Sequence, residues 1–283
     1  MIKNLVDSIP DGADRTKVYA TTGQMRNFYQ QLGDGFFSVL DTMNYMQHHM
    51  IVQMARKGDH LLDMCCGRGL LLPLLRYQRA ALGSYTGVDI DKSNAIFRQK
   101  KVHNNKPLEP GYYPFPVYFA ECDVAEMTAK LPLNHYDLVV YTSSIEHMHP
   151  SVGETSLHEA FAVAAPGARM IVTCPVTPED RSGYDTQYSY HVYEPKRSEI
   201  ELWLHEAGWD IETVFGLLIN ITDIREGLSP ELLKVFERQH EYIPNEWLTP
   251  LYAFLLPERA KEIAYICTKG EVHGYSSVHS TDH

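Results

Sequence analysis

An acidic residue and a glycine-containing turn stand together in the stretch LLDMCCGRGLLLPLLR, where one apolar run gives way to another. Asp63 ends the first run, and Gly67 and Gly69 follow within six residues. Glycine permits a positive φ and a close approach of the backbone to a ligand, and free N–H groups at the start of a helix form a polar cradle. Asp89 lies twenty residues past Gly69, a distance from which an acid reaches the two hydroxyls of a ribose. The combination predicts a site for an adenosine-type cofactor.

Two further polar stretches follow strand-like segments. Asp123, in AECDV, can accept a hydrogen bond from the exocyclic amine of a base; the alternative is an Asp that caps a helix or loop. The segment YDLVVYTSSIEHMHP carries Asp137 near its start and leads through small polar residues to Glu146 and His147. Open α/β sheets bind ligands at the carboxyl ends of their strands, so we expect these residues along one edge.

Short β-rich runs alternate with helical stretches from residue 60 onward, which predicts a parallel sheet with helices on both faces. The predicted strands are 60–64, 84–90, 116–120, 136–142, 169–174, 210–216 and 262–268. The helices expected between them are 70–79, 93–102, 153–164 and 196–207. Apolar spacing predicts two or three helices over 24–56, broken near 33–35. Ser229 and Pro230 are expected to start another helix, and the aromatic segment 244–258 is interrupted by prolines.

Cys65 occupies the position where such a turn usually has its first glycine, and Cys66 follows it. Because Cys65 carries a Cβ atom, we expect its backbone to have a negative φ. Adjacent cysteines rarely share a tetrahedral metal, which leaves a catalytic thiol as the alternative to a packing role. The chain has five cysteines and no CxxC pair, so we expect free thiols in a reducing cytoplasm, and neither a disulfide framework nor a zinc site.

A dinucleotide-dependent oxidoreductase is disfavoured because its glycine fingerprint needs a third glycine, whereas three leucines follow Gly69. In their order and spacing, the polar stretches resemble the class I S-adenosylmethionine-dependent methyltransferases over about residues 58–215. LLDMCCGRG resembles the family's first strand and glycine-rich loop, GVDID its second-strand acid, CDV its adenine corner and YDLVVYTSSIEHM its fourth strand. PGARMIVTCP resembles the turn into its fifth strand, and 190–216 its next helix and sixth strand.

The resemblance implies an α/β, Rossmann-like fold with a seven-stranded, mostly parallel sheet and an antiparallel last strand. It also implies S-adenosylmethionine as the cofactor. By position, Asp63 would lie near the methionine amino group, Asp89 would bind the ribose hydroxyls, and Asp123 would bind the adenine amine. The remaining residues of the expected cofactor site are Cys65, Gly67, Gly69, Ile90, Val124, Tyr141 and Thr142, of which Tyr141 and Thr142 would flank the sulfonium.

Methyl transfer to a hydroxyl or protonated amine needs a base, and the candidates are Glu146, His147 and His191, with His149 as a further one. The alternative for Glu146 and His147 is a structural role at the start of a helix. His191 stands in the aromatic segment YSYHVYEP, where substrate contact and packing are both open. We expect no metal, because the sequence shows no clear ligand set for one.

The regions outside the core pattern are expected to build the substrate site. They are a helical segment or lid at 1–57 and a cap insertion at 217–260, within a methyltransferase domain at 58–283 whose tail, 270–283, is expected to be disordered. In simple members of the family the last two strands form a hairpin, whereas about forty residues, rich in aromatics, intervene here. The alternative for the insertion is a dimer interface, so a homodimer is possible.

The net charge of −11 disfavours nucleic acid as a partner, and without an apolar run of about 18 residues no membrane partner is expected. We therefore predict a cytoplasmic enzyme that transfers a methyl group to oxygen or nitrogen of a small organic acceptor by in-line displacement. Two alternatives stay open: methylation of RNA or protein, and a non-catalytic binding or scaffold protein with the same fold.

Overall fold

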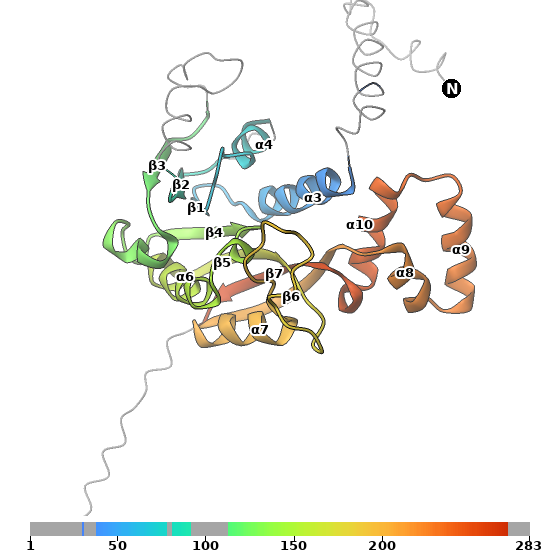
Figure 1. The fold of residues 1–283 in the computed structure, drawn as a ribbon. Helices are drawn as coiled ribbons and strands as arrows, with labels where there is room; N and C mark the ends of the chain where they lie inside the picture. The colour runs from blue at the N-terminus through green and yellow to red at the C-terminus, as the bar shows by residue number, and fades with distance from the viewer. Residues whose placement is uncertain (1–29, 31–37, 78–80, 92–112, 271–283) are drawn as a thin grey trace, which may run out of the picture.

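A single sheet organises the part of the chain that the computed structural model describes, which is residue 30 and residues 38–77, 81–91 and 113–270 (Figure 1). Its strands are β1 (His60–Met64), β2 (Ser84–Asp89), β3 (Val117–Glu121), β4 (Tyr136–Thr142), β5 (Ala164–Pro175), β6 (Trp209–Leu218) and β7 (Glu262–Lys269). All seven predicted strands are present, with ends shifted by a few residues. The predicted helices before residue 38, the helix at 93–102 and the tail from residue 271 lie outside the described residues.

The strand order is β3-β2-β1-β4-β5-β7-β6. Strands β1 to β5 pair in parallel, and β7 is antiparallel to both of its neighbours, β5 and β6. This confirms the predicted seven-stranded, mostly parallel sheet with an antiparallel last strand. The order of the strands reverses at the adjacent parallel pair β1 and β4, so the connections that leave these two strands run to opposite sides at the carboxyl edge and leave room for a ligand there.

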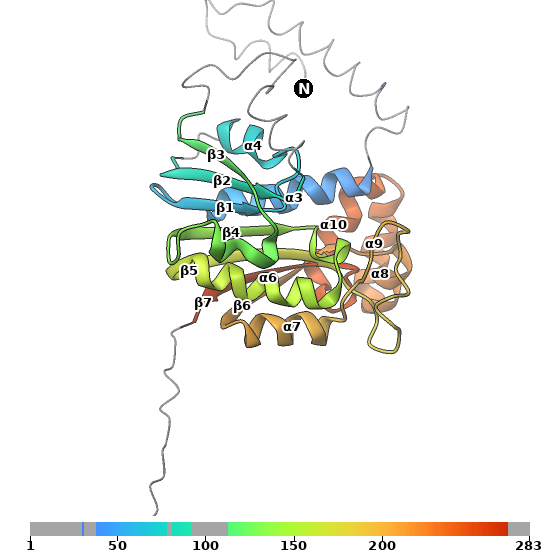
Figure 2. The same cartoon turned by 60° about the vertical axis from the view of Figure 1, so that its left-hand side comes forward.

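Helices cover both faces of the sheet (Figures 1 and 2). The α-helices are α3 (Val39–Met54), α4 (Leu71–Tyr77), α6 (Pro150–Val163), α7 (Arg197–Glu206), α8 (Ile221–Gly227), α9 (Pro230–His240) and α10 (Asn245–Leu255). Three short 3₁₀ helices, η1 (Val124–Ala129), η2 (Ile145–His147) and η3 (Pro257–Arg259), follow β3, β4 and α10. Apolar residues of α3 and α4 pack on one face, and those of α6 and α7 pack on the other.

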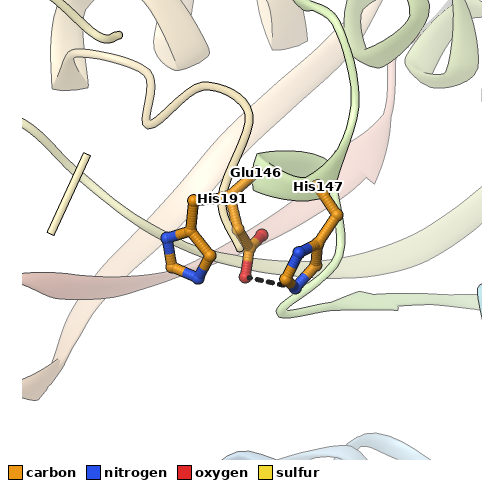
Figure 3. Close-up of side chains that lie close together, drawn as sticks. All are labelled: Glu146, His147 and His191. Carbon is orange, nitrogen blue, oxygen red and sulfur yellow. Dashed lines mark ion pairs between the residues drawn. The ribbon is translucent and has the colours of Figure 1, made fainter. Parts of the chain in front are cut away.

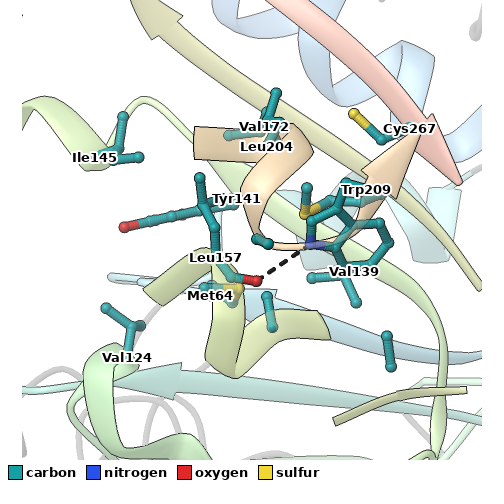
Figure 4. Close-up of a cluster of buried hydrophobic side chains, with 14 of the residues drawn as sticks. Met64, Val124, Val139, Tyr141, Ile145, Leu157, Val172, Leu204, Trp209 and Cys267 are labelled. Atoms are coloured by element: carbon teal, nitrogen blue, oxygen red, sulfur yellow. Dashed lines mark hydrogen bonds between the residues drawn. The ribbon is translucent and has the colours of Figure 1, made fainter. Parts of the chain in front are cut away.

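The period of two along each strand divides the core between these faces. Leu61 belongs to the cluster beside α3 and α4, while the next residue, Leu62, belongs to the cluster beside α6 and α7. Trp209 is the largest side chain of the second cluster, and its indole N–H donates to the carbonyl oxygen of Leu157 at 3.2 Å (Figure 4). Successive apolar residues of a strand therefore pack on opposite faces of the sheet, and these contacts fix the two helical layers. A run of apolar residues in the sequence predicts such a strand.

The insertion between β6 and β7 is helical, as expected, and has an apolar cluster of its own that includes Phe236 and Leu248. Ser229 caps α9 by accepting a hydrogen bond from the N–H of Leu232, and Pro230 occupies the first helical position, as predicted. The expected interruption of 244–258 by prolines is wrong in one respect, because α10 continues through Pro250. That proline is buried in a helix that packs on β6 and α3, and this packing offsets the missing hydrogen bond.

Candidate functional site

The turn after β1 has a left-handed backbone at three of its positions. The φ angles are 53° at Cys65, 49° at Gly67 and 62° at Gly69. The N–H of Cys66 donates to the carbonyl oxygen of Val88 at 2.9 Å, which fastens the turn to the end of β2. The predicted glycine turn is therefore a tight, largely half-buried turn beside β2.

The expectation of a negative φ at Cys65 is wrong. Hydrogen bonds at both ends of the turn fix its path, so residue 65 adopts a left-handed backbone although it has a Cβ atom. Burial raises the pKa of the Cys65 thiol well above its usual value, and nearby negative charges, led by that of Asp89, add to the rise. Because only a thiolate is an effective nucleophile, the alternative of a catalytic thiol is disfavoured.

Replacing Cys65 with Gly is expected to raise the free energy of unfolding by about 1 kcal/mol, because glycine adopts the left-handed region without the steric cost that a Cβ atom causes. Chemical denaturation followed by circular dichroism measures this difference. Cys66→Gly is the matched control; Cys66 has no positive φ, so that change should lower stability. Equal effects of the two substitutions would contradict the role of backbone strain at residue 65.

Asp89 connects β2 to the glycine turn. Its Oδ2 accepts a hydrogen bond from the N–H of Gly67 at 2.8 Å, and its Oδ1 accepts one from the N–H of Asp91 at 2.8 Å. A carboxylate has about four acceptor positions, so acceptor capacity remains for the hydroxyls of a ribose. The next side chain, Ile90, is 69 % exposed, although a large aliphatic group favours burial. Together the two residues offer a polar and an apolar surface for an adenosine.

Asp63, near the end of β1, and Asp123, just after β3, lie on either side of β2 and already have partners. Asp63 is buried and accepts a hydrogen bond from the hydroxyl of Tyr85 at 2.6 Å. Asp123 caps η1 by accepting a hydrogen bond from the N–H of Ala125 at 2.9 Å, which is the alternative role considered for it. Val124 is buried beside it. The cap uses one oxygen of Asp123, so contact with an adenine amine stays a prediction.

Tyr141 does not present its side chain to this edge. It is fully buried against α6, and its hydroxyl accepts a hydrogen bond from Oγ of Ser156 at 3.1 Å (Figure 4). The period of two explains this orientation, because Val139 and Tyr141 face one side of the sheet and Val140 faces the other. At the sulfonium position, Tyr141 could therefore supply backbone atoms only, whereas Thr142 is half-buried at the end of β4.

Negative charge gathers at the carboxyl edge of the sheet. Carboxyl groups that follow or end four different strands lie close enough to raise the pKa of the Cys65 thiol: Asp89, Asp63, Asp123 and Glu146. Opposite charges attract strongly where water is excluded. This edge therefore suits a ligand that carries positive charge, such as a sulfonium or an ammonium group.

Glu146, His147 and His191 come together beyond the end of β4 (Figure 3). The N–H groups of Val192 and Tyr193 donate to the carbonyl oxygen of Glu146 at 2.8 and 3.1 Å, which docks the loop after β5 against η2. One ligand atom from each of the three side chains lies within 4.8 Å of the others. The three residues that the sequence offered as bases are thus neighbours, whereas His149 caps α6 instead.

Glu146 is an unusual member of this cluster. Its side chain is buried, and among the described residues its Oε2 has no hydrogen-bond partner. Burial raises the pKa of Glu146 to about 8, and the negative charge of Glu194 contributes to the rise. A buried carboxyl oxygen without a hydrogen-bond partner is costly, and a carboxyl whose pKa is shifted in this way makes Glu146 a candidate for a functional role.

Sequence reasoning missed Glu194. Its Oε1 accepts hydrogen bonds from Nδ1 of His191 at 2.6 Å and from the N–H of Gln187 at 2.8 Å, and the residue is fully buried. The i, i+3 spacing of His191 and Glu194 within one aromatic segment is the signal that could have found it. A carboxylate on Nδ1 orients an imidazole and leaves its Nε2 for other chemistry.

A second buried polar group that the sequence did not reveal lies beside this cluster. Gln47, on α3, accepts hydrogen bonds through Oε1 from the hydroxyl of Thr173 at 2.8 Å and that of Ser143 at 3.3 Å. Glu262, at the start of β7, accepts one from Ser143 at 3.4 Å, and burial raises its pKa well above the usual value. Helix α3 thus contributes directly to this edge of the sheet.

Residues 39–214 match the profile of a family described as methyltransferase domain. The match spans more than half of the chain, so the chain belongs to this family, within the class I S-adenosylmethionine-dependent methyltransferases, and its cofactor is S-adenosylmethionine. No protein of curated function matches this sequence. Among the described residues, no helix has the length and apolar character needed to span a membrane.

Solved structures share the fold. An S-adenosylmethionine-dependent methyltransferase from Archaeoglobus fulgidus is 17 % identical, with a TM-score of 0.52 over 85 % of this chain and 100 % of that chain. The 1,6-didemethyltoxoflavin-N1-methyltransferase of Burkholderia thailandensis, solved with its acceptor and S-adenosylhomocysteine, is 14 % identical, with a TM-score of 0.51 over 93 % and 94 %. The [4+2]-cyclase SpnF is 18 % identical, with a TM-score of 0.50 over 79 % of each chain. These likenesses establish the architecture.

Proposed function

We propose that this protein transfers the methyl group of S-adenosylmethionine to an oxygen or nitrogen atom of a small organic acceptor by in-line displacement. The observation that carries the proposal is the cluster of Glu146, His147 and His191 beyond β4 (Figure 3). Glu146 lies near enough to the cofactor turn for its charge to raise the pKa of Cys65. When bound, the cofactor supplies a methyl group that its sulfonium already activates. The chain must therefore position the acceptor atom and remove the proton that this atom loses on methylation.

The residues at the carboxyl edge fit S-adenosylmethionine. The glycine turn, which includes Gly69, and Asp89 would hold the ribose and methionine parts, because the left-handed turn lets the backbone approach a ligand closely and Asp89 keeps acceptor capacity. Asp63, on β1 just before the turn, would lie near the methionine amino group. Asp123 and Ile90 would contact the adenine. The gathered carboxyls favour the positive charge of the cofactor.

The histidine cluster would receive the proton of the acceptor. Glu194 positions His191 by accepting the hydrogen bond from its Nδ1, so Nε2 is free to take a proton or bind a group that does. The side chain of His147 is 42 % exposed, which gives an acceptor access to this point from solvent. The cluster also stacks against Tyr190, a surface suited to a planar acceptor.

A small acceptor is favoured over RNA or protein by the net charge of −11 and by the apolar insertion at 217–260. We propose that the insertion caps the site and that α3, the described part of the predicted segment 1–57, closes it together with the insertion, since α3 carries Gln47 and packs on α10. The Burkholderia neighbour is named for methylating a small heterocycle, which agrees with this class of acceptor. A homodimer through the insertion and a cytoplasmic location stay predictions; light scattering measures the first.

Calorimetric titration with S-adenosylmethionine, followed by a screen of hydroxyl and amine acceptors for formation of S-adenosylhomocysteine, tests the proposal. Binding and turnover support it. Binding without turnover on any small acceptor would favour RNA, protein or a non-catalytic role, and no binding would exclude methyl transfer.

His191→Ala is expected to lower the rate of S-adenosylhomocysteine formation about 100- to 10,000-fold, since a positioned group that handles a proton contributes this much. Cofactor affinity should change little, because His191 is not in the cofactor turn. His205→Ala, on the exposed side of α7, is the matched control and should retain full turnover. An unaltered rate in His191→Ala would remove this residue from the mechanism.

A further inference from the structure

Three side chains with metal-binding atoms converge beyond β4. They come from η2 and from the loop after β5, and one ligand atom of each lies within 4.8 Å of the others. Nε2 of His147 lies 3.9 Å from Oε1 of Glu146. Ligand atoms that share a divalent cation at bonds of about 2.1 Å lie roughly 3 to 4 Å apart, so small side-chain rotations would bring the three to coordination distance.

In both histidines, Nδ1 already has a hydrogen-bond partner, which holds the ring in place. The carbonyl oxygen of Tyr190, 3.1 Å from Nδ1 of His147, can only accept a hydrogen bond, so this nitrogen carries the proton. Nδ1 of His191 likewise donates to Glu194 at 2.6 Å. In the neutral form of each ring the lone pair therefore lies on Nε2, the nitrogen that would bind a metal, and a carboxylate behind a metal-binding histidine is the usual supporting arrangement.

Glu146 would supply the negative charge of the group when a cation binds. The residue is 2 % exposed, and its Oε2 has no hydrogen-bond partner among the described residues. A buried carboxyl oxygen in this state lacks the compensation that buried polar atoms normally have. A cation at the cluster would provide that compensation.

We propose that Glu146, His147 and His191 bind one divalent transition-metal ion. Two imidazoles and one carboxylate select zinc, manganese or iron over magnesium and calcium, which prefer oxygen ligands alone. Three protein ligands leave coordination positions of the metal open. Because His147 is partly exposed, these open positions would face solvent. The sequence did not suggest this site because His191 is 44 residues from His147 along the chain and reaches it only through the docked loop.

A role for the metal follows, and this role rests on the proposed methyl transfer. A hydroxyl acceptor, such as a phenol or an enol, would place its oxygen at an open position, where the cation lowers the pKa of the hydroxyl. With the metal bound to Nε2 of His191, that nitrogen no longer takes the proton, which leaves instead to water past the exposed edge of His147. The oxygen then forms a bond to the methyl carbon while the carbon–sulfur bond breaks and its electron pair stays on sulfur. The site thus selects oxygen over nitrogen acceptors.

The test is a titration of the full chain, freed of metal, with Co²⁺, followed by visible absorption and calorimetry. Wild-type protein is expected to bind one equivalent with absorption bands typical of nitrogen and oxygen ligands. His191→Ala and Glu146→Gln should bind at least 10-fold more weakly, and Glu194→Gln should lose about 10- to 100-fold as a positioning residue. His205→Ala is the control, because it removes an exposed histidine elsewhere.

His147→Ala provides a second variant if the buried substitutions do not fold, since the side chain of His147 is 42 % exposed. Co²⁺ binding that is unchanged in His191→Ala and His147→Ala would overturn the metal site, as would wild-type protein that takes up no Co²⁺. Titration with S-adenosylmethionine in the same samples distinguishes failure of the metal site from failure of the proposed methyltransferase function. Metal binding without cofactor binding would refute the methyltransferase function alone, and turnover that resists chelators would refute the role of the metal.

Discussion

Replacing Asp89 with Ala is expected to weaken the binding of S-adenosylmethionine about 100-fold or more. The carboxylate would accept hydrogen bonds from two ribose hydroxyls, and bonds to a charged group contribute about 1.5 to 3 kcal/mol each. The substitution also removes the acceptor for the N–H of Gly67, so the cofactor turn loses its connection to β2. Because each 1.4 kcal/mol corresponds to about a factor of ten in affinity, a loss near 3 kcal/mol gives this change.

Calorimetric titration measures the Asp89→Ala effect without any knowledge of the acceptor. Asp210→Ala is the matched control, since Asp210 is exposed near the start of β6, away from the carboxyl edge, and its loss should leave affinity unchanged. Asp89→Asn keeps an acceptor oxygen and removes the charge, so its affinity should lie between the other two. Equal affinity of Asp89→Ala and wild-type protein would overturn the ribose assignment, and circular dichroism confirms that the variant folds.

Gly216→Ala is expected to lower the free energy of unfolding by about 3 kcal/mol. A Cβ atom at this position in β6 would lie 2.7 Å from Cβ of Ala260 and would collide with the carbonyl oxygen of Ala253 in α10. Neither neighbour is the end of a flexible side chain, so α10 must shift away from the sheet. The variant therefore tests whether the insertion is held firmly on β6.

Thermal unfolding should show a drop in Tm of roughly 6 to 12 °C for Gly216→Ala. Hydrogen exchange of α8 to α10 should accelerate at the same time, because these helices share one apolar cluster. Gly167→Ala is the control; it has open space around it but a φ of 71°, so we expect a cost of about 1 kcal/mol. If the two variants lose equal stability, close packing of α10 on β6 is not a major source of stability.

The sheet and the cofactor turn were predictable because their signals are local. Short β-rich runs at 60–64 and 136–142 predicted β1 and β4, and the spacing of Gly69 and Asp89 placed an acid beside the turn. Ser229 and Pro230 started α9 as their chemistry requires. In each case, backbone preferences of neighbouring residues decide the structure before any distant contact forms.

The errors have physical causes of another kind. Cys65 adopts a left-handed φ because hydrogen bonds to β2 fix the path of the turn, and no property of the cysteine indicates this. Tyr141 points into the core because the strand alternates, so its position in the sequence near the site does not place its side chain there. Helix α10 continues through Pro250 because tertiary packing offsets a local defect.

By itself, the sequence determined the strands of the sheet and which polar residues follow them, since hydrophobic pattern and motif spacing act over short distances, and its resemblance to the family correctly implied the methyltransferase fold and the cofactor. Only the tertiary structure decided how the chemical groups combine. Glu194 behind His191, and Gln47 and Glu262 beside Ser143, meet through elements far apart in the chain. Glu146, His147 and His191 likewise lie close together only because the loop after β5 docks against η2. Such contacts form only when distant segments pack together, so neither the residue types nor their spacing along the chain reveals them.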